Sequence, residues 1–129
     1  MGANRTIRIM LVEDHVAFRE TLAFLLTHQS DIEVVAQAGS LAEAREALDG
    51  RLGGSLDVAV VDLSLPDGDG SELIGELRQT DSGISVVVLS AAMGLGHLDD
   101  VVKARADAVL DKIESIPTIV EEVRRLTGG

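Results

Sequence analysis

The chain has 129 residues, enough for one domain with a buried core and too few for two ordinary domains. It contains no cysteine, which excludes disulfide frameworks and thiolate metal sites, and its formal net charge of -11 disfavours direct binding to nucleic acid. No apolar run reaches membrane-spanning length, and the first residues lack the pattern of an export signal. We therefore expect a cytoplasmic protein that does not associate with membranes.

Five short apolar runs alternate with amphipathic segments, which is the pattern of a parallel sheet covered by helices on both faces. Aromatic residues make up only 2% of the chain, so we expect a core of Val, Leu, Ile and Ala. Most of the runs are continuously apolar and β-branched, as buried parallel strands are. The five strands are expected at Ile7 to Val12, Ile32 to Ala38, Asp57 to Val61, Ile84 to Leu89 and Ala108 to Leu110.

Helical spacing and capping signals indicate four helices between and after these strands. Ser40 is a candidate N-cap with Glu43 in the capping-box position, and Pro117 suits the first turn of the last helix. The four helices are expected at about Val16 to Thr27, from Leu41 to the loop Gly50 to Gly54, Ser71 to Arg78, and from Ser115 onward.

A fifth helix is expected between the fourth and fifth strands. Gly94 and Gly96 stand where its first turn would begin, which leaves only His97 to about Ala104 helical. We therefore expect an α/β fold in which residues 1–129 form a single domain with five strands and five helices. Residues 127–129 could begin a linker.

Polar side chains follow the carboxyl ends of the predicted strands. The first strand is followed by Glu13 and Asp14, the third by Asp62, the fourth by Ser90, and the fifth almost at once by Lys112. In a doubly wound sheet, ligands bind beyond these strand ends. Three clustered carboxylates repel one another unless a cation lies among them, and Mg²⁺ suits oxygen ligands. A carboxylate beside such an ion can attack a phosphoryl group, so Asp62 is the central candidate nucleophile.

Each of these residues also has an ordinary structural interpretation. Asp14 could cap the first helix, and Lys112 could be a solvated surface charge. Asp62 could end a strand before the turn at Asp67 to Gly70. The joint occurrence of these residue types at successive strand ends favours a functional site.

Four segments resemble the response-regulator receiver domain, which is a CheY-like family, and the resemblance covers essentially the whole chain. The segments are Leu11 to His15, Val60 to Gly70, Val88 to Ala91 and Ala106 to Lys112. The runs Glu13 to Glu20 and Asp31 to Val35 are most similar to receivers of LuxR/NarL-type transcription regulators. The resemblance implies a flavodoxin-like, doubly wound fold with the five strands in the order 2-1-3-4-5.

The resemblance also implies a role for each residue at the acidic strand ends. Asp62 would accept a phosphoryl group from a partner histidine kinase. Mg²⁺ would be held by Asp14, Asp62 and the main-chain carbonyl of Ser64, with Glu13 acting through water. Lys112 would contact the phosphoryl group.

In the family, a hydroxyl group, here that of Ser90, shifts toward the phosphoryl group and repacks an output surface. This surface is formed by the fourth helix, the fifth strand and the last helix, and its repacking changes the partner or the dimer state. The resemblance thus implies that the domain could form a homodimer through this surface and relay the signal to a C-terminal DNA-binding domain. Val109 stands where receivers commonly place Tyr or Phe, and Arg105 stands where this subgroup usually has glycine. The usual aromatic switch is therefore missing.

The resemblance implies a signalling module that catalyses only its own phosphorylation and dephosphorylation. The chain could instead be a stand-alone receiver that acts by protein contact. An aspartate-nucleophile phosphatase is a different class, but that family has a second acid where this chain has Ser64. A flavodoxin-like cofactor binder would need a phosphate-cradling first loop and aromatic residues to stack a flavin, and this sequence has neither.

Overall fold

The computed structural model describes residues 6–50, 56–80, 83–90, 105–112 and 115–128. Its main body is a five-stranded sheet in the order β2-β1-β3-β6-β7, and every neighbouring pair is parallel. This is the expected order for the five strands. The strands are β1 (Ile7–Val12), β2 (Ile32–Ala38), β3 (Val58–Asp62), β6 (Ser85–Ser90) and β7 (Ala108–Asp111).

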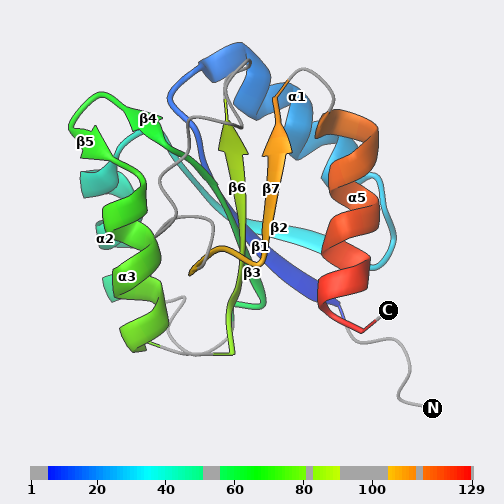
Figure 1. The fold of residues 1–129 in the computed structure, drawn as a ribbon. Coiled ribbons are helices and arrows are strands. Elements are labelled where there is room, and N and C mark those ends of the chain that lie inside the picture. The colour runs from blue at the N-terminus through cyan, green and yellow to red at the C-terminus, as the bar shows by residue number, and fades with distance from the viewer. Residues whose placement is uncertain (1–5, 51–55, 81–82, 91–104, 113–114, 129) are drawn as a thin grey trace.

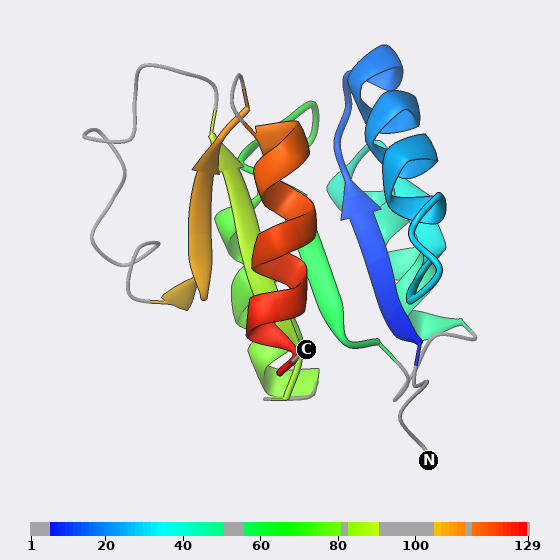
Figure 2. The same cartoon turned by 90° about the vertical axis from the view of Figure 1, so that its right-hand side faces the viewer.

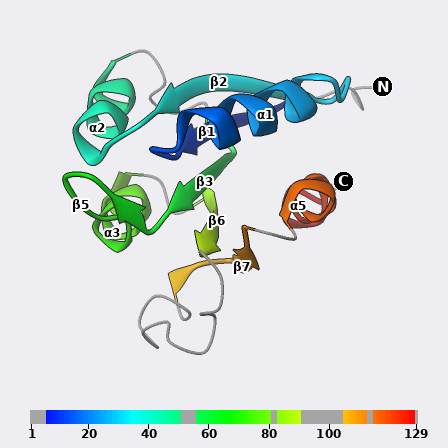
Figure 3. The same cartoon turned by 90° about the horizontal axis from the view of Figure 1, so that it is seen from above.

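Helices cover both faces of this sheet, with α2 and α3 on one side and α1 and α5 on the other (Figures 1 and 3). Figure 2 shows α5 lying alongside β6 and β7, and it contacts both strands. The expected helix over His97 to Ala104, with Gly94 and Gly96 before it, lies outside the described residues. Within the described ranges, no helix is both long and apolar enough to cross a membrane. The helices are α1 (Val16–Thr27), α2 (Leu41–Asp49), α3 (Ser71–Thr80) and α5 (Ser115–Leu126).

Two aliphatic clusters form the core, one on each face of the sheet. Successive residues of β1 alternate between them, because side chains of a strand point to opposite faces: Met10 lies under α2 and α3, and Leu11 lies under α1 and α5. Val109 is half-buried and packs against the α2–α3 cluster. The core of Val, Leu, Ile and Ala expected from the composition is thus present, with Met10 added.

The N-terminus of α2 forms as the sequence predicts. The Ser40 hydroxyl accepts a hydrogen bond from the Glu43 N–H at 3.1 Å. The Glu43 carboxylate in turn accepts from the Gly39 N–H at 2.7 Å, one residue earlier than in the usual capping box. These two contacts fix where the chain turns from β2 into α2.

A small hairpin of β4 (Ser64–Leu65) and β5 (Gly68–Asp69) follows β3, where the sequence predicted only a turn. Asp67 lies at its tip and reaches the start of α2. Its carboxylate oxygens accept hydrogen bonds from the N–H groups of Leu41 at 2.8 Å and Ala42 at 3.0 Å. These two bonds hold the pKa of Asp67 below its usual range. The loop after β3 is thereby tied to α2.

Candidate functional site

The polar residues predicted from the strand ends meet at the carboxyl edge of the sheet. Glu13 follows β1, Asp62 ends β3, Ser90 ends β6 and Lys112 follows β7. Carboxylate oxygens of Glu13, Asp14 and Asp62 lie within 4.8 Å of one another. The structure therefore brings together all three acids and the lysine.

Two of the three acids are removed from water. Glu13 is 1% exposed and Asp62 is 2% exposed, whereas Asp14 lies at the surface. The Lys112 ammonium lies 2.9 and 3.0 Å from the two Glu13 oxygens and 3.5 Å from Oδ2 of Asp62. One lysine against three carboxylates leaves two negative charges, which a divalent cation would balance. The donor set therefore fits a hard cation such as Mg²⁺.

The protonation equilibria of the site reflect this crowding. Burial and the charges of Glu13 and Asp14 together raise the pKa of Asp62 to about 6, against the opposing effects of the Ser64 N–H and Lys112. Burial alone would lower the pKa of Lys112, but its hydrogen bond to Glu13 and the charge of Asp62 raise it above the usual value. At neutral pH, Asp62 is thus mostly a carboxylate, which is the nucleophilic form.

Main-chain groups orient the acids. The His15 N–H donates to Oε2 of Glu13 at 2.9 Å, and the Ser64 N–H donates to Oδ1 of Asp62 at 3.1 Å. The main chain also joins the other two site residues, because the Lys112 N–H donates to the Ser90 carbonyl at 2.9 Å. Each functional side chain is therefore carried by backbone that the fold holds in place.

Gly70 supports the site in a way that the sequence pattern did not reveal. A Cβ atom at this position would lie 2.2 Å from the carbonyl oxygen of Asp62 and 3.0 Å from Cα of Leu63. The chain entering α3 thus passes directly against the backbone of Asp62. The sequence marked Gly70 only as a turn residue, since a close approach between distant segments leaves no local signal.

The structure corrects the alternative role of Asp14 as the cap of α1. His15 is the N-cap, and its Nδ1 accepts a hydrogen bond from the Phe18 N–H at 3.3 Å. Asp14 is therefore left beside the other two acids. The Phe18 ring, on α1, lies 5.1 Å from the Lys112 ammonium, within the range of a cation–π contact.

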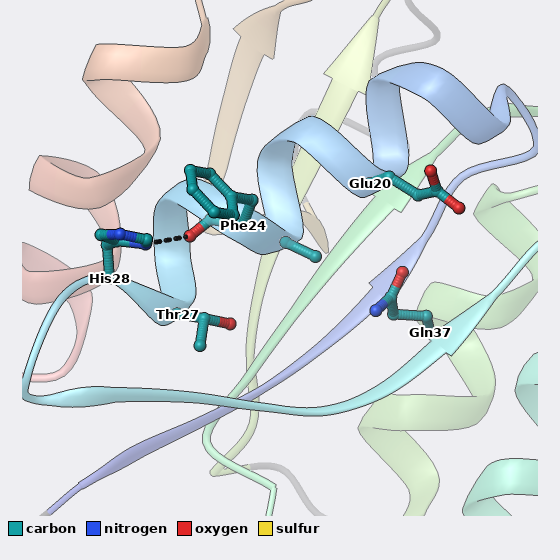
Figure 4. Close-up of a pocket in the computed structure, with 6 residues that line it drawn as sticks. Glu20, Phe24, Thr27, His28 and Gln37 are labelled. Carbon is teal, nitrogen blue, oxygen red and sulfur yellow. Dashed lines mark hydrogen bonds between the residues drawn. The ribbon is translucent and has the colours of Figure 1, made fainter.

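A hollow of about 400 Å³ lies beside α1 and β2 and shares no residue with the acidic cluster. The Phe24 side chain is 61% exposed there and lies 4.3 Å from the His28 ring between centroids. Figure 4 shows the His28 ring meeting the carbonyl oxygen of Phe24, with Glu20 and Gln37 at the other end. The polar groups that it contains do not converge as those of the acidic cluster do. The lining residues are Glu20, Ala23, Phe24, Thr27, His28 and Gln37.

Comparison with known proteins decides the family. The sequence profile of the response regulator receiver domain matches residues 9–124. The chain belongs to this family. The transcriptional regulatory protein UhpA of Salmonella typhimurium is 34% identical to this receiver over 124 residues. That match covers 95% of the receiver chain and 60% of UhpA, so the chain spans about three fifths of the length of this relative.

Solved receiver structures share the fold. The receiver domain of the response regulator NarL from Mycobacterium tuberculosis has a TM-score of 0.77 and 25% identity, covering 97% of this chain and 98% of that one. A LuxR-family response regulator from Aurantimonas sp. SI85-9A1 has a TM-score of 0.80 and 28% identity, covering 95% of this chain and 86% of that one. The expected similarity to LuxR/NarL-type receivers is confirmed. Receivers of this family are signalling modules of two-component systems, which interact with histidine kinases and are controlled by phosphorylation.

Proposed function

We propose that Asp62 is the phosphoacceptor of this receiver. Asp14, Asp62 and the main-chain carbonyl of Ser64 would hold Mg²⁺, with Glu13 acting through water. The observation that carries the proposal is the uncompensated charge: three carboxylates lie within 4.8 Å, and two of them are buried with Lys112 between them. When bound, the ion supplies positive charge beside the transferred group.

The residues present suit transfer from a phosphohistidine. An oxygen of the ionised Asp62 carboxylate attacks phosphorus, the bond from phosphorus to the imidazole nitrogen breaks, and the leaving imidazole takes up a proton. Lys112 is placed to neutralise the negative charge of the phosphoryl oxygens. The Ser90 hydroxyl would shift toward the phosphoryl group. Water later cleaves the acyl phosphate, so the module catalyses only its own phosphorylation and dephosphorylation.

Labelling with a small phosphodonor tests this assignment. We expect acetyl phosphate with Mg²⁺ to add one phosphoryl group, detected by mass spectrometry, and Asp62→Asn to abolish the addition. The matched control is Asp57→Asn, because Asp57 lies at the opposite edge of the sheet, where it contacts the main chain of Arg8. The Asp57→Asn variant should be labelled like the wild type, and a chelator of Mg²⁺ should stop labelling of both proteins. Undiminished labelling of Asp62→Asn would contradict the assignment.

We further propose that residues 1–129 are the receiver domain of a longer DNA-binding regulator, with 127–129 as the start of a linker. The support is that UhpA, a transcriptional regulatory protein, extends well beyond the matched region. The relay would run through the output surface, to which β7 and α5 belong, and a homodimer could form there. Sizing with and without phosphodonor tests the dimer, and a stop codon directly after Gly129 in the reading frame would favour a stand-alone, cytoplasmic receiver.

A further inference from the structure

Arg19, on the first turns of α1, points back beneath the corner between β1 and α1. Its Nη1 donates a hydrogen bond to the main-chain oxygen of Glu13 at 2.7 Å. Gly39, which follows β2, provides the space for this contact, because a Cβ atom there would lie 3.0 Å from the same Nη1. The guanidinium therefore lies between the segments that follow the neighbouring strands β1 and β2.

This arginine is not placed for an ordinary ion pair. Of the ion pairs found among the described residues, none includes Arg19. Its Nε is buried and has no hydrogen-bond acceptor within the part of the chain that the structure describes. A buried donor without a partner costs stability, so the arrangement calls for an explanation other than stability.

The contact with Glu13 supplies that explanation. The Glu13 N–H is held by the Ala38 carbonyl at 2.9 Å, and the Glu13 carbonyl is held by Arg19, so both sides of this residue are fixed. The peptide plane that contains this carbonyl leads directly into Asp14. Its orientation therefore decides where the exposed acid of the cluster points.

We propose that Arg19 is a positioning residue, which holds the Glu13–Asp14 peptide in the orientation that the metal site requires. This inference rests on the proposed function of the acidic cluster. Two effects of Arg19 compete, because its positive charge near the acids weakens cation binding while its hydrogen bond orders the ligands. The proposal states that the ordering dominates.

The test is the Mg²⁺ dissociation constant, measured by calorimetry on the wild type and on Arg19→Gln and Arg19→Lys. We expect Arg19→Gln to weaken Mg²⁺ binding about tenfold, as the loss of a group that orients metal ligands does. Arg19→Lys keeps the charge and one donor, so its loss should be smaller. The matched control is Arg124→Gln, because Arg124 pairs with Asp31 and lies outside the site. It should leave Mg²⁺ affinity unchanged.

Gly39→Ala probes the same contact without removing the arginine, in case Arg19→Gln fails to fold. The added methyl group pushes on Nη1, so Mg²⁺ affinity should fall in the same direction but by less. Unchanged or tighter Mg²⁺ binding in Arg19→Gln, or in Gly39→Ala where Arg19→Gln does not fold, would overturn the proposal.

A readout without metal separates this proposal from the proposed function. We expect the amides of Glu13 and His15 to exchange hydrogen faster in metal-free Arg19→Gln, relative to the Val60 amide in the sheet interior. Arg124→Gln should leave this ratio unchanged. A wild type that binds no Mg²⁺ would refute the metal site, and the exchange ratio would then decide whether Arg19 orders the corner. An unchanged ratio would refute the positioning role.

Discussion

Both edges of the sheet carry carboxylates, but the carboxylates have different partners at the two edges. At the amino edge, the protein itself satisfies each acid. Asp57 accepts the N–H of Arg8 at 2.8 Å, and Asp107 accepts the N–H of Val86 at 2.7 Å. Arg78 adds an ion pair to Asp107 at 2.8 Å. These two carboxylates accept main-chain N–H groups of the neighbouring strands and so join adjacent segments of the chain.

At the carboxyl edge, Glu13 and Asp62 share Lys112, Asp14 lies beside them, and the pKa of Asp62 rises to about 6. Such an arrangement costs stability and is typical of a functional site. The difference teaches that a buried acid is informative only together with its partners. Glu13 and Asp62 also accept main-chain N–H groups, so what distinguishes the carboxyl edge is that three carboxylates lie within 4.8 Å of one another, an arrangement that favours a bound cation.

The largest effect should come from the backbone beneath the charged edge. We expect Gly70→Ala to lower the free energy of unfolding by about 3 kcal/mol, because its Cβ atom would lie 2.2 Å from the Asp62 carbonyl. Urea denaturation measures this loss. Gly50→Ala is the control, since its Cβ atom would make only ordinary contacts at 3.5 Å or more. Equal stability of the two variants would contradict this prediction, because it would show that the backbone next to the site can shift to accommodate a Cβ atom at position 70.

The next effect tests the amino edge. Asp107→Ala should cost about 1 to 2 kcal/mol of unfolding free energy, because the buried Val86 N–H loses its acceptor. Asp107→Asn retains an acceptor oxygen and should lose less. Phosphodonor labelling at 25 °C should stay unchanged in both variants. A labelling defect with normal stability would mean that the two edges are coupled, and would contradict the view that the acids of the amino edge act only on stability.

At the carboxyl edge, removing a charge should stabilise the protein. The pKa of Asp62 rises from 3.8 to about 6 on folding, so its ionisation destabilises the folded state progressively from about pH 4 to pH 6. Asp62→Asn should therefore be about 2 kcal/mol more stable than the wild type at pH 7 without divalent cations, and about equal at pH 4. Denaturation at both pH values, with Asp57→Asn as the control, measures this. A loss of stability at pH 7 would refute the idea that the site is charge-strained.

The smallest effect has the opposite pH dependence. The hydrogen bond from Arg124 lowers the pKa of Asp31, so this pair stabilises the fold above the ordinary carboxyl pKa of 3.8 and stops doing so as the pH falls through the lowered value. Both side chains are partly exposed, so Arg124→Gln should cost about 0.5 kcal/mol at pH 7. Thermal unfolding at neutral and acid pH checks this. A larger cost in acid than at pH 7 would contradict the sign.

Most of the fold could be predicted from the sequence, because β-branched runs and helical spacing are local signals. The strands predicted at Asp57 to Val61 and Ile84 to Leu89 each begin and end one residue later in the structure. Ile84, just before β6, is buried, and Asp57, just before β3, accepts a hydrogen bond from the Arg8 N–H. Hydropathy alone therefore does not fix where these two strands begin. The short β4–β5 hairpin was missed, because two-residue strands leave no periodic pattern.

The charged members of the site could also be predicted, because strand ends converge in any parallel sheet. Gly70 and Arg19 could not be found in this way. Gly70 matters because it passes the Asp62 carbonyl, and Arg19 matters because it reaches the Glu13 carbonyl. Both contacts involve main-chain atoms, which every residue has, so no residue type in the sequence marks them.

The hydrogen bond from the Lys112 N–H to the Ser90 carbonyl has a consequence for how a signal leaves the site. Val109 is β-branched, which restricts its χ1 angle, and its side chain is too short to swing between inner and outer positions as a large ring can. Ser90 and Lys112, however, are joined by this main-chain hydrogen bond at the end of β6 and β7, and β7 is the edge strand of the sheet. A displacement at Ser90 would therefore reach Lys112 through a main-chain hydrogen bond, without a rotating side chain at position 109.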